Sequence, residues 1–287
     1  MNHCGPTREW RCRDRVLRCG EQSIIMGVLN VTPDSFSDGG RYVSPELAVA
    51  RAQEMLDDGA DIIDVGGESS RPGAAPVPVE EEMNRVLPVI QAISHHSSAV
   101  LSIDTTKVEV ARSALASGAH IINDITAGEA DPTMLDLAAE TGAGLVLMHM
   151  QGRPQTMQDN PKYADLVADV TAYLSTRAEL AQQRGVSPQS IAVDPGIGFG
   201  KTFDHNWMLL SELQQLSALP YPVLIGISRK RFLGELCGRE VDERMPASLA
   251  AAVMARSHGA AIIRVHDVKE TCDALRVTDR LLREEAL

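Results

Sequence analysis

Aromatic side chains are scarce in this sequence of 287 residues, at 3% of the chain, and positive charge is in short supply. The chain has 27 Lys and Arg against 39 Asp and Glu, a formal net charge of −12 at pH 7. Because binding to a phosphate backbone needs a basic face, we expect no nucleic-acid partner. A few local cations can still dominate one cleft, so a small anionic ligand is not excluded. With so few aromatic rings, the core must be mainly aliphatic.

Regularly spaced cysteines and long apolar runs are also missing. The five cysteines are odd in number and irregular in spacing, which argues against a disulfide framework. Three of them lie in the Arg-rich start, but none has the CxxC spacing of a zinc site, so we expect free thiols. No stretch approaches the ~18 apolar residues of a membrane span, and the start lacks the apolar region of a signal peptide. These absences predict a soluble, cytoplasmic protein.

A repeated helix-to-strand junction is the strongest internal pattern. Gly-Ala precedes a short apolar run four times, within residues 59–65, 118–123, 142–148 and 259–265 (in the third, strand residues follow a further Gly). Glycine is favoured just after a helix because it adopts left-handed backbone angles without steric cost. The apolar runs do not alternate with polar residues, which is typical of parallel strands buried on both faces.

Four more apolar runs complete a regular alternation of strands and helices. They lie at 24–29, 100–103, 191–193 and 223–227, and the predicted helices lie at about 45–58, 79–94, 108–117, 132–141, 163–184, 206–216, 246–258 and 268–285. Eight strands and eight helices predict an α/β fold, a single closed (β/α)8 TIM barrel over residues 24–287. The alternative, an open doubly wound sheet, is disfavoured by the even spacing. Residues 1–23 are an N-terminal extension, in which 10–12 and 16–19 can pair as a hairpin over the bottom of the barrel.

Polar side chains follow every predicted strand. In chain order they are Asn30, Gly66-Gly67-Glu68, Asp104, Asn123-Asp124, His149, Asp194, Ser228-Arg229-Lys230, and Arg264 with His266. The C-terminal ends of barrel strands meet at one face, which carries the chemistry of such enzymes. Buried charges are costly unless paired or used, so this pattern indicates function. For Asp124, Thr105 or Ser228 alone, a capping or core role is the simpler interpretation.

Three glycine-bearing segments stand out between the predicted elements. The stretch 194–202 is not a P-loop, because that motif needs Gly where Pro195 stands. We interpret it as a flexible turn that presents Asp194. The loops 30–40 and 66–73 follow adjacent strands, and Phe36 and Arg71 at their tips indicate lids that close over ligands.

Eight motifs resemble the dihydropteroate synthase family. They are MGVLNVTPDSFSDGG (26–40), DVGGESSRPG (64–73), SIDTTK (102–107), INDI (122–125), LMHMQGRPQTMQ (147–158), DPGIGFGK (194–201), ISRKRF (227–232) and RVHDV (264–268). They cover nearly all of the chain after the extension, which makes the resemblance specific. It implies a transferase of folate biosynthesis that joins (7,8-dihydropterin-6-yl)methyl diphosphate to 4-aminobenzoate, releases diphosphate and uses Mg²⁺. It also implies a homodimer, for which the run 247–254 and the final helix are candidate contacts.

The resemblance assigns roles to individual residues. The pterin would be held by Asp104, Asn123, Asp194 and Lys230; the diphosphate by Asn30, Arg264 and His266, with Asn30 also on the metal; and the 4-aminobenzoate would lie near Phe36, Ser70, Arg71, Pro72 and Lys230. The catalytic set is Asp104, Lys230, Arg264 and His266. These roles suit the chemistry, because a carboxylate accepts the two N–H donors of an aminopyrimidine edge and a guanidinium suits a diphosphate.

Two positions depart from the family pattern. Ser70 stands where the family usually has Thr, and Arg231 stands where Ser is common. Either change can alter sensitivity to sulfonamides, which mimic 4-aminobenzoate, and the sequence does not give the sign. Two alternatives remain open. A pterin-binding methyltransferase domain would lack the two loops, and a non-catalytic pterin-binding homologue would have lost Lys230, Asp104 or Arg264.

Overall fold

Eight parallel strands follow one another around a single sheet in the computed structural model, which describes residues 7–32, 45–69 and 74–284. The strands are β3 (Ile24–Asn30), β4 (Ile62–Gly66), β5 (Val100–Asp104), β6 (Ile121–Asp124), β7 (Gly144–Met148), β8 (Ile191–Asp194), β9 (Leu224–Gly226) and β10 (Ile262–Val265). β10 pairs with both β3 and β9. Val193 on β8 bridges to Val223 and donates its N–H to the Pro222 carbonyl at 3.0 Å, which brings β8 to β9. The predicted (β/α)8 barrel is confirmed.

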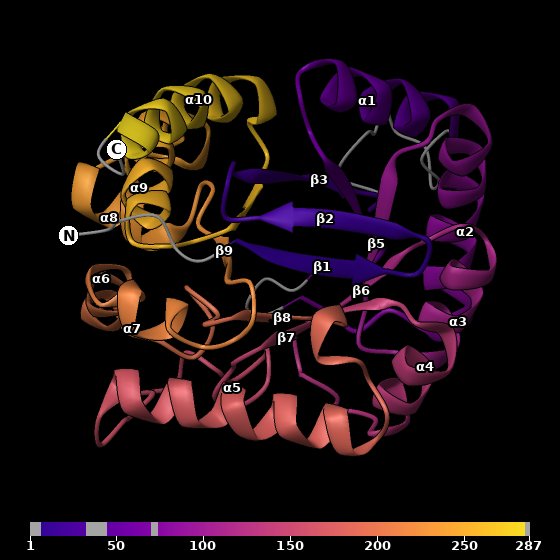
Figure 1. The fold of residues 1–287 in the computed structure, drawn as a ribbon, viewed down its shortest axis with the longest axis horizontal. Coiled ribbons are helices and arrows are strands. Elements are labelled where there is room, and N and C mark those ends of the chain that lie inside the picture. Colours follow the sequence, from indigo (N-terminus) through magenta and orange to yellow (C-terminus); the bar gives the residue numbers. More distant parts are fainter. Residues whose placement is uncertain (1–6, 33–44, 70–73, 285–287) are drawn as a thin grey trace.

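Helices form a ring around the barrel (Figure 1). They are α1 (Pro45–Asp57), α2 (Val79–His96), α3 (Val108–Ala116), α4 (Thr133–Thr141), α5 (Leu166–Gln183), α6 (Phe203–Ser211), α7 (Leu213–Ser217), α8 (Arg231–Cys237), α9 (Met245–Ser257) and α10 (Val268–Glu284), with 3₁₀ turns at Pro188–Ser190 and Val241–Glu243. The helix predicted at 206–216 is divided into α6 and α7 at Glu212, and the short α8 was not among the predicted helices. No helix in this described part of the chain is long and apolar enough to cross a membrane.

The four predicted junction glycines adopt the left-handed backbone that the pattern requires. Their φ angles are 105° at Gly59, 112° at Gly118, 65° at Gly142 and 97° at Gly259. A side chain at such an angle would be strained, so glycine ends each helix and turns the chain into the next strand. This part of the sequence interpretation is confirmed.

Alternate strand residues belong to two separate cores. Ile63, Val65, Leu101 and their equivalents pack outward against the helices, whereas Ile62, Val100 and theirs pack inside the barrel. Successive side chains of a strand point to opposite faces, so every second residue lies inside. The same alternation decides which polar residues reach the mouth of the barrel.

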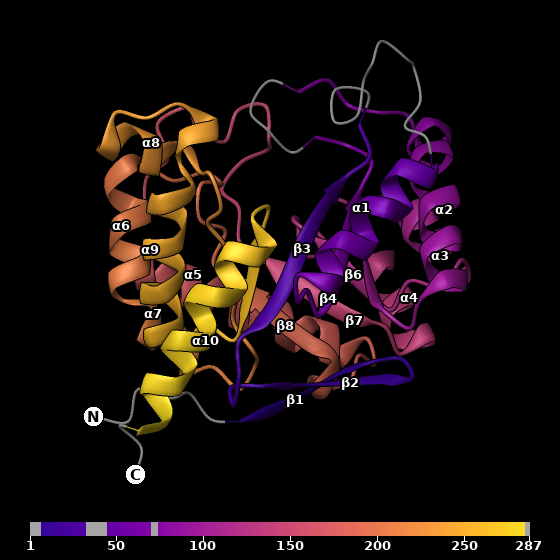
Figure 2. The same ribbon diagram turned by 90° about the horizontal axis from the view of Figure 1, so that it is seen from above.

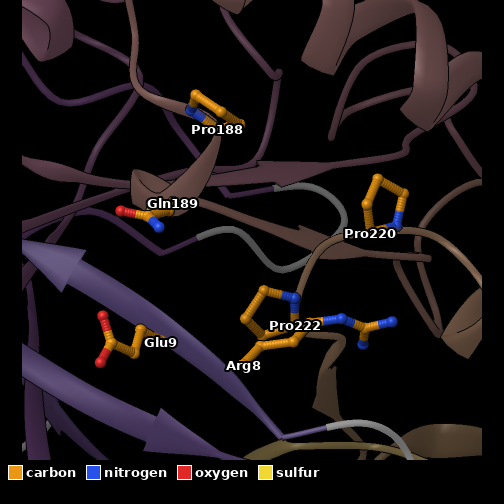
Figure 3. Close-up of a pocket in the computed structure, with 6 residues that line it drawn as sticks. All are labelled: Arg8, Glu9, Pro188, Gln189, Pro220 and Pro222. Atoms are coloured by element: carbon orange, nitrogen blue, oxygen red, sulfur yellow. The ribbon is translucent and has the colours of Figure 1, made fainter.

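A hairpin of β1 (Arg8–Cys12) and β2 (Arg15–Cys19) lies across the end of the barrel from which the strands start (Figure 2). Trp10 is fully buried in the inner core, and its indole N–H donates to the Ser190 carbonyl at 3.0 Å. The predicted hairpin is confirmed. A cavity of about 290 Å³ at this end is lined by Arg8, Glu9, Pro188, Gln189, Pro220 and Pro222 (Figure 3). The Arg8 guanidinium already donates to three carbonyls there, so this end closes and stabilises the barrel.

The four cysteines in the described residues are free thiols, as the sequence predicted. Cys12 and Cys19 are buried in the hairpin and Cys272 in α10, whereas Cys237 is exposed. Burial raises the pKa of the Cys19 thiol to about 12 and that of Cys272 to about 11, so both remain protonated near neutral pH. Their role is packing.

Candidate functional site

Polar side chains from several strands face inward at the C-terminal end of the barrel. Counting in steps of two from Ile62, Val100, Ile121, Ala192 and Ile262, all of which belong to the inner core, reaches Asp64, Asp104, Asn123, Asp194 and Arg264. These residues come from five different strands, which is how a TIM barrel assembles a site from distant parts of the sequence. The sequence analysis named four of them and missed Asp64, although the alternation was a signal that could have found it.

Arg264 lies between two carboxylates. Its Nε donates to Oδ2 of Asp64 at 2.7 Å, and its Nη2 donates to Oδ2 of Asp104 at 2.7 Å. Asn123 donates from Nδ2 to the same Oδ2 of Asp64 at 3.0 Å. Burial raises the pKa of Asp104 to about 7, with Arg264 opposing and Asp64 adding to the shift. The two carboxylates in turn raise the pKa of Arg264, which stays charged.

Asp194 is held by the turn that follows it. Its Oδ1 accepts the Gly196 N–H at 2.7 Å, and burial raises its pKa to about 6, so it is mainly ionised at pH 7. Gly196 has a φ of +69°, and a Cβ there would lie 1.9 Å from the His149 carbonyl oxygen. Two further hydrogen bonds hold the turn: the Gly198 N–H donates to Asn206 Oδ1, and the Tyr163 hydroxyl donates to the Gly200 carbonyl. The turn packs closely on the end of β7 and presents Asp194, as the sequence indicates, and its flexibility stays a prediction.

Lys230 approaches the mouth from the start of α8. Its ammonium lies 4.2 Å from the centre of the Phe199 ring, a cation–π contact that the sequence analysis did not foresee. Burial lowers the pKa of Lys230 to about 8, and the nearby carboxylates of Asp194 and Asp104 oppose the shift. Lys230 is therefore mainly protonated at pH 7, with a ring and two carboxylates around it.

Lys201 is a second buried cation that the sequence analysis missed. It is 2% exposed, and its Nζ donates to Nδ1 of His149 at 2.9 Å and to the Phe199 carbonyl at 2.9 Å. Burial lowers the pKa of Lys201 to about 7. Burial, together with the positive charge of Lys201, also lowers the pKa of His149 to about 3. The neutral His149 accepts at Nδ1. Lys201 thus connects the turn after β8 to the end of β7, and its hydrogen bond to the Phe199 carbonyl helps to hold the Phe199 backbone in place.

His266 is neutral in this setting. Burial, with the nearby positive charge of Arg264, lowers its pKa to about 4. Its backbone N–H donates to Ser228 Oγ at 3.2 Å, and its Nδ1 lies 3.1 Å from the same oxygen. The Ser228 hydroxyl can then donate to Nδ1, which leaves Nε2–H as the donor. Of the two forms considered from the sequence, the N–H-donating form is supported and the protonated form is not.

Acidic residues anchor the start of the second loop. Glu68 accepts from Lys107 at one oxygen and from the Val77 N–H at the other, the latter at 3.1 Å. Lys107 also donates to the fully buried Glu82 of α2. The two ends of the loop, at Glu68 and Val77, are thereby held together beside Asp104. Phe36, Ser70, Arg71 and Pro72, which the sequence analysis assigned to the lids, lie outside the described residues.

Two residues with uncertain roles in the sequence analysis turn away from the mouth. Asp124 follows the inward-facing Asn123 and so faces outward, where it accepts N–H donors from Thr126 and Gly128 at 2.8 and 2.6 Å. Its structural interpretation is confirmed. Arg231 is 85% exposed along its side chain and pairs with Glu235 one turn further along α8, at 2.8 Å. The Arg231 side chain therefore points to solvent.

Room for a ligand and a hard oxygen for a metal lie beside this cluster. A cavity of about 540 Å³ has Asp104 and Glu68 in its wall together with Arg153 and Tyr173, a size typical of small-molecule sites. Asn30 Oδ1 and Asp104 Oδ2 each lie 3.8 Å from the point that a Cβ on Gly66 would occupy. Two side-chain oxygens therefore lie near this point at the end of β4. The described residues contain no cluster of three or more His, Cys, Asp or Glu that could hold a metal alone.

Comparisons with known proteins match the whole barrel. A family model described as a pterin binding enzyme matches residues 26–266. The chain is 50% identical over 258 residues to dihydropteroate synthase of Escherichia coli (strain K12), covering 90% of this chain and 91% of that protein. It is similar to the solved structure of Xanthomonas albilineans dihydropteroate synthase with 4-aminobenzoic acid, with a TM-score of 0.90 and 45% identity over 96% of this chain and 98% of the other. A Yersinia pestis dihydropteroate synthase in a sulfonamide drug complex also has a TM-score of 0.90, with 43% identity over 95% and 98% of the two chains.

Proposed function

Because the chain belongs to the dihydropteroate synthase family of pterin-binding enzymes, we propose that it joins (7,8-dihydropterin-6-yl)methyl diphosphate to 4-aminobenzoate. The products are 7,8-dihydropteroate and diphosphate. The observation that carries the proposal is the inward-facing cluster of Asp104, Asn123, Asp194 and Arg264, with Lys230 beside it. At one end of the barrel this cluster places carboxylates that can accept from the N–H groups of a pterin beside the Arg264 cation, which can bind a diphosphate.

The pterin would bind deepest. Asp194 is ionised and has one oxygen on its own turn, so its other oxygen is available to the aminopyrimidine N–H groups. Asn123 gives one N–H to Asp64, which leaves its carbonyl oxygen and second N–H for the pterin ring. Lys230 supplies a charged donor from the α8 side. The polar groups of the site are thus complementary to a ring that carries both donors and acceptors.

The diphosphate would lie towards Arg264, His266 and Asn30. Arg264 keeps its charge, and neutral His266 donates from Nε2. Mg²⁺ fits the donors present, because it prefers hard oxygen ligands and commonly takes few from protein and others from phosphate. Asn30 would hold it, and the position of Asn30 Oδ1 at the barrel mouth, near the end of β4, supports this assignment. When bound, the ion would neutralise charge on the departing diphosphate.

The reaction would follow a dissociative path. Loss of diphosphate leaves a pterin-methyl cation, and Asp104 in its ionised form, which the contact with Arg264 favours, would stabilise that cation. The amine of 4-aminobenzoate is neutral near pH 7 and needs no strong base. Labelled diphosphate should therefore exchange into the pterin substrate without 4-aminobenzoate. Exchange that requires 4-aminobenzoate would overturn this order of events.

The benzoate would lie near Lys230 and the Phe199 ring, with the loop residues Phe36, Ser70, Arg71 and Pro72 completing its pocket. Because Arg231 points to solvent, it should not alter sulfonamide sensitivity. The Arg231→Ser variant should then show a sulfonamide inhibition constant within about twofold of wild type, as is usual for an exposed side chain far from a ligand. A larger shift would place Arg231 in the pocket and leave Ser70 as the lesser departure.

A homodimer through α9 and α10 accompanies this proposal. The two helices lie side by side (Figures 1 and 2). Met254 on α9 and Val277 and Leu281 on α10 are 53–62% exposed. Exposed large apolar side chains on two adjacent helices support an interaction site there. Light scattering after size exclusion should give the mass of two chains, and Leu281→Arg should give one. A wild-type monomer at micromolar concentration would refute the dimer.

Diphosphate release is the direct test of the proposed activity. The purified protein is incubated with both substrates and Mg²⁺, and diphosphate and 7,8-dihydropteroate are followed together. Equal amounts of both products support the synthase. Binding of the pterin diphosphate without release of diphosphate would favour a non-catalytic pterin-binding homologue. The retention of Lys230, Asp104 and Arg264 argues against that alternative.

A further inference from the structure

Asp64 is a buried carboxylate beneath the residues to which the proposed function assigns the pterin diphosphate. It lies on β4, faces the barrel interior and has no exposed surface. Its Oδ2 accepts from Arg264 Nε at 2.7 Å and from Asn123 Nδ2 at 3.0 Å. One oxygen atom of β4 therefore contacts both β6 and β10. It joins Arg264, to which we assign the diphosphate, to Asn123, to which we assign the pterin.

The position of the Arg264 guanidinium depends on this contact. Asp64 takes Nε and Asp104 takes Nη2, so two carboxylates on neighbouring strands hold one edge of the planar group. A guanidinium held at two points cannot rotate about its last bonds without losing a charge-assisted hydrogen bond. The Nη1 edge makes no hydrogen bond within residues 7–32, 45–69 and 74–284, so it is left to face a ligand.

The Asn123 amide is oriented in the same way. With Nδ2 committed to Asp64, the carbonyl oxygen must point elsewhere, because a carboxylate repels another acceptor. Rotation of the amide by 180° would set two acceptor oxygens against each other. Asp64 thereby selects which atom of Asn123 reaches the mouth of the barrel.

We propose that Asp64 is a positioning residue, which orients Arg264 and Asn123 for the pterin diphosphate without touching it. The inference rests on the proposed function of those two residues. A stabilising role alone explains less, because Asp64 Oδ1 is also buried and has no hydrogen-bond partner in the described part of the chain. A buried carboxylate with an unpaired oxygen is costly, so its presence here favours a functional reason.

The test compares Asp64→Asn with Ser102→Ala. Ser102 is the direct neighbour of Asp64 on β5, is equally buried, and makes no hydrogen bond through its hydroxyl within the described residues. Asn keeps the shape of the side chain but removes the negative charge, and its amide group replaces one of the two acceptor oxygens with an N–H donor. We expect the KM for the pterin diphosphate to rise roughly tenfold to a hundredfold, the range typical of misplaced binding groups. The KM for 4-aminobenzoate, measured at saturating pterin diphosphate, should stay within about threefold, because neither Arg264 nor Asn123 is assigned to it.

Three outcomes separate positioning from a structural role. A pterin-specific rise in KM with Ser102→Ala unchanged supports the proposal. Equal losses for both substrates, or no loss for either, overturn it. If Asp64→Asn does not fold, Asp64→Ser removes the charge with a smaller side chain, and failure of both variants to fold also overturns it, because the carboxylate would then serve stability.

Failure of the proposed function would be visible separately. If the wild-type protein released no diphosphate, calorimetric titration with (7,8-dihydropterin-6-yl)methyl diphosphate would still compare wild type with Asp64→Asn. Binding weakened roughly tenfold or more in the variant supports positioning in a binding protein. Equal affinities, or no binding by wild type, overturn the inference.

Discussion

The end of the barrel closed by the hairpin should govern stability without governing activity, and Trp10→Ala tests this separation. Trp10 is fully buried in the inner core, beside Cys12 and Cys19, and its indole N–H donates to the Ser190 carbonyl. Truncating a buried Trp to Ala typically costs about 3–5 kcal/mol, and leaving a buried carbonyl unpaired adds about 1 kcal/mol. We therefore expect a loss of about 4–6 kcal/mol, a large part of the roughly 5–15 kcal/mol that stabilises most domains.

The measurement is urea-induced unfolding followed by circular dichroism, with thermal unfolding beside it. A loss of this size lowers the midpoint temperature of a domain of this length by roughly 10 °C. At 25 °C the folded variant should keep kcat/KM within about twofold of wild type, because the site lies at the opposite end of the strands. Val16→Ala is the matched control, because Val16 belongs to the same hairpin but is 53% exposed, and it should cost less than about 0.5 kcal/mol.

Two results would refute this reasoning. A loss below about 1 kcal/mol for Trp10→Ala would mean that the hairpin does not seal the inner core. A large fall in kcat/KM with little loss of stability would mean that the hairpin communicates with the catalytic end.

Three further predictions concern the catalytic end. Gly196→Ala should lose more than about a hundredfold in kcat/KM, because the new Cβ would lie 1.9 Å from the His149 carbonyl oxygen. Gly238→Ala has the same left-handed backbone but open space around it, so it should lose only about 1–2 kcal/mol of stability. Similar activity losses in both variants would contradict the steric argument. The kcat/KM for the pterin diphosphate should rise as Asp104 ionises near its pKa of about 7 and fall as Lys230 loses its proton near its pKa of about 8, and a flat profile from pH 6 to 9 would exclude these roles. Chelation should abolish turnover, and added Mg²⁺ should restore it. The unfolding temperature should stay unchanged, because the described residues supply too few ligands for a structural metal. A lower unfolding temperature after chelation would argue for a structural site instead.

The sequence by itself determined the barrel and most of the residues at its mouth. The Gly-Ala junctions and apolar runs are local signals, because a left-handed glycine and a buried strand each impose constraints on adjacent residues. The polar residues at strand ends followed from the rule that such ends share one face, and the motifs named their family. The placement of Asp104, Asn123, Asp194, Lys230 and Arg264 at one end of the barrel was therefore predictable, while their chemical roles stay predictions.

Only the tertiary structure decided how those residues act on one another. Asp64 and Arg264 are 200 positions apart in the sequence, and their contact depends on β3 joining β4 to β10. The close packing of the turn after Asp194 on the end of β7 and the Lys201 contact with His149 likewise depend on segments that are distant in the sequence. Ionisation at the mouth follows from the same cause, because burial and neighbouring charges set each pKa and neither is a property of local sequence.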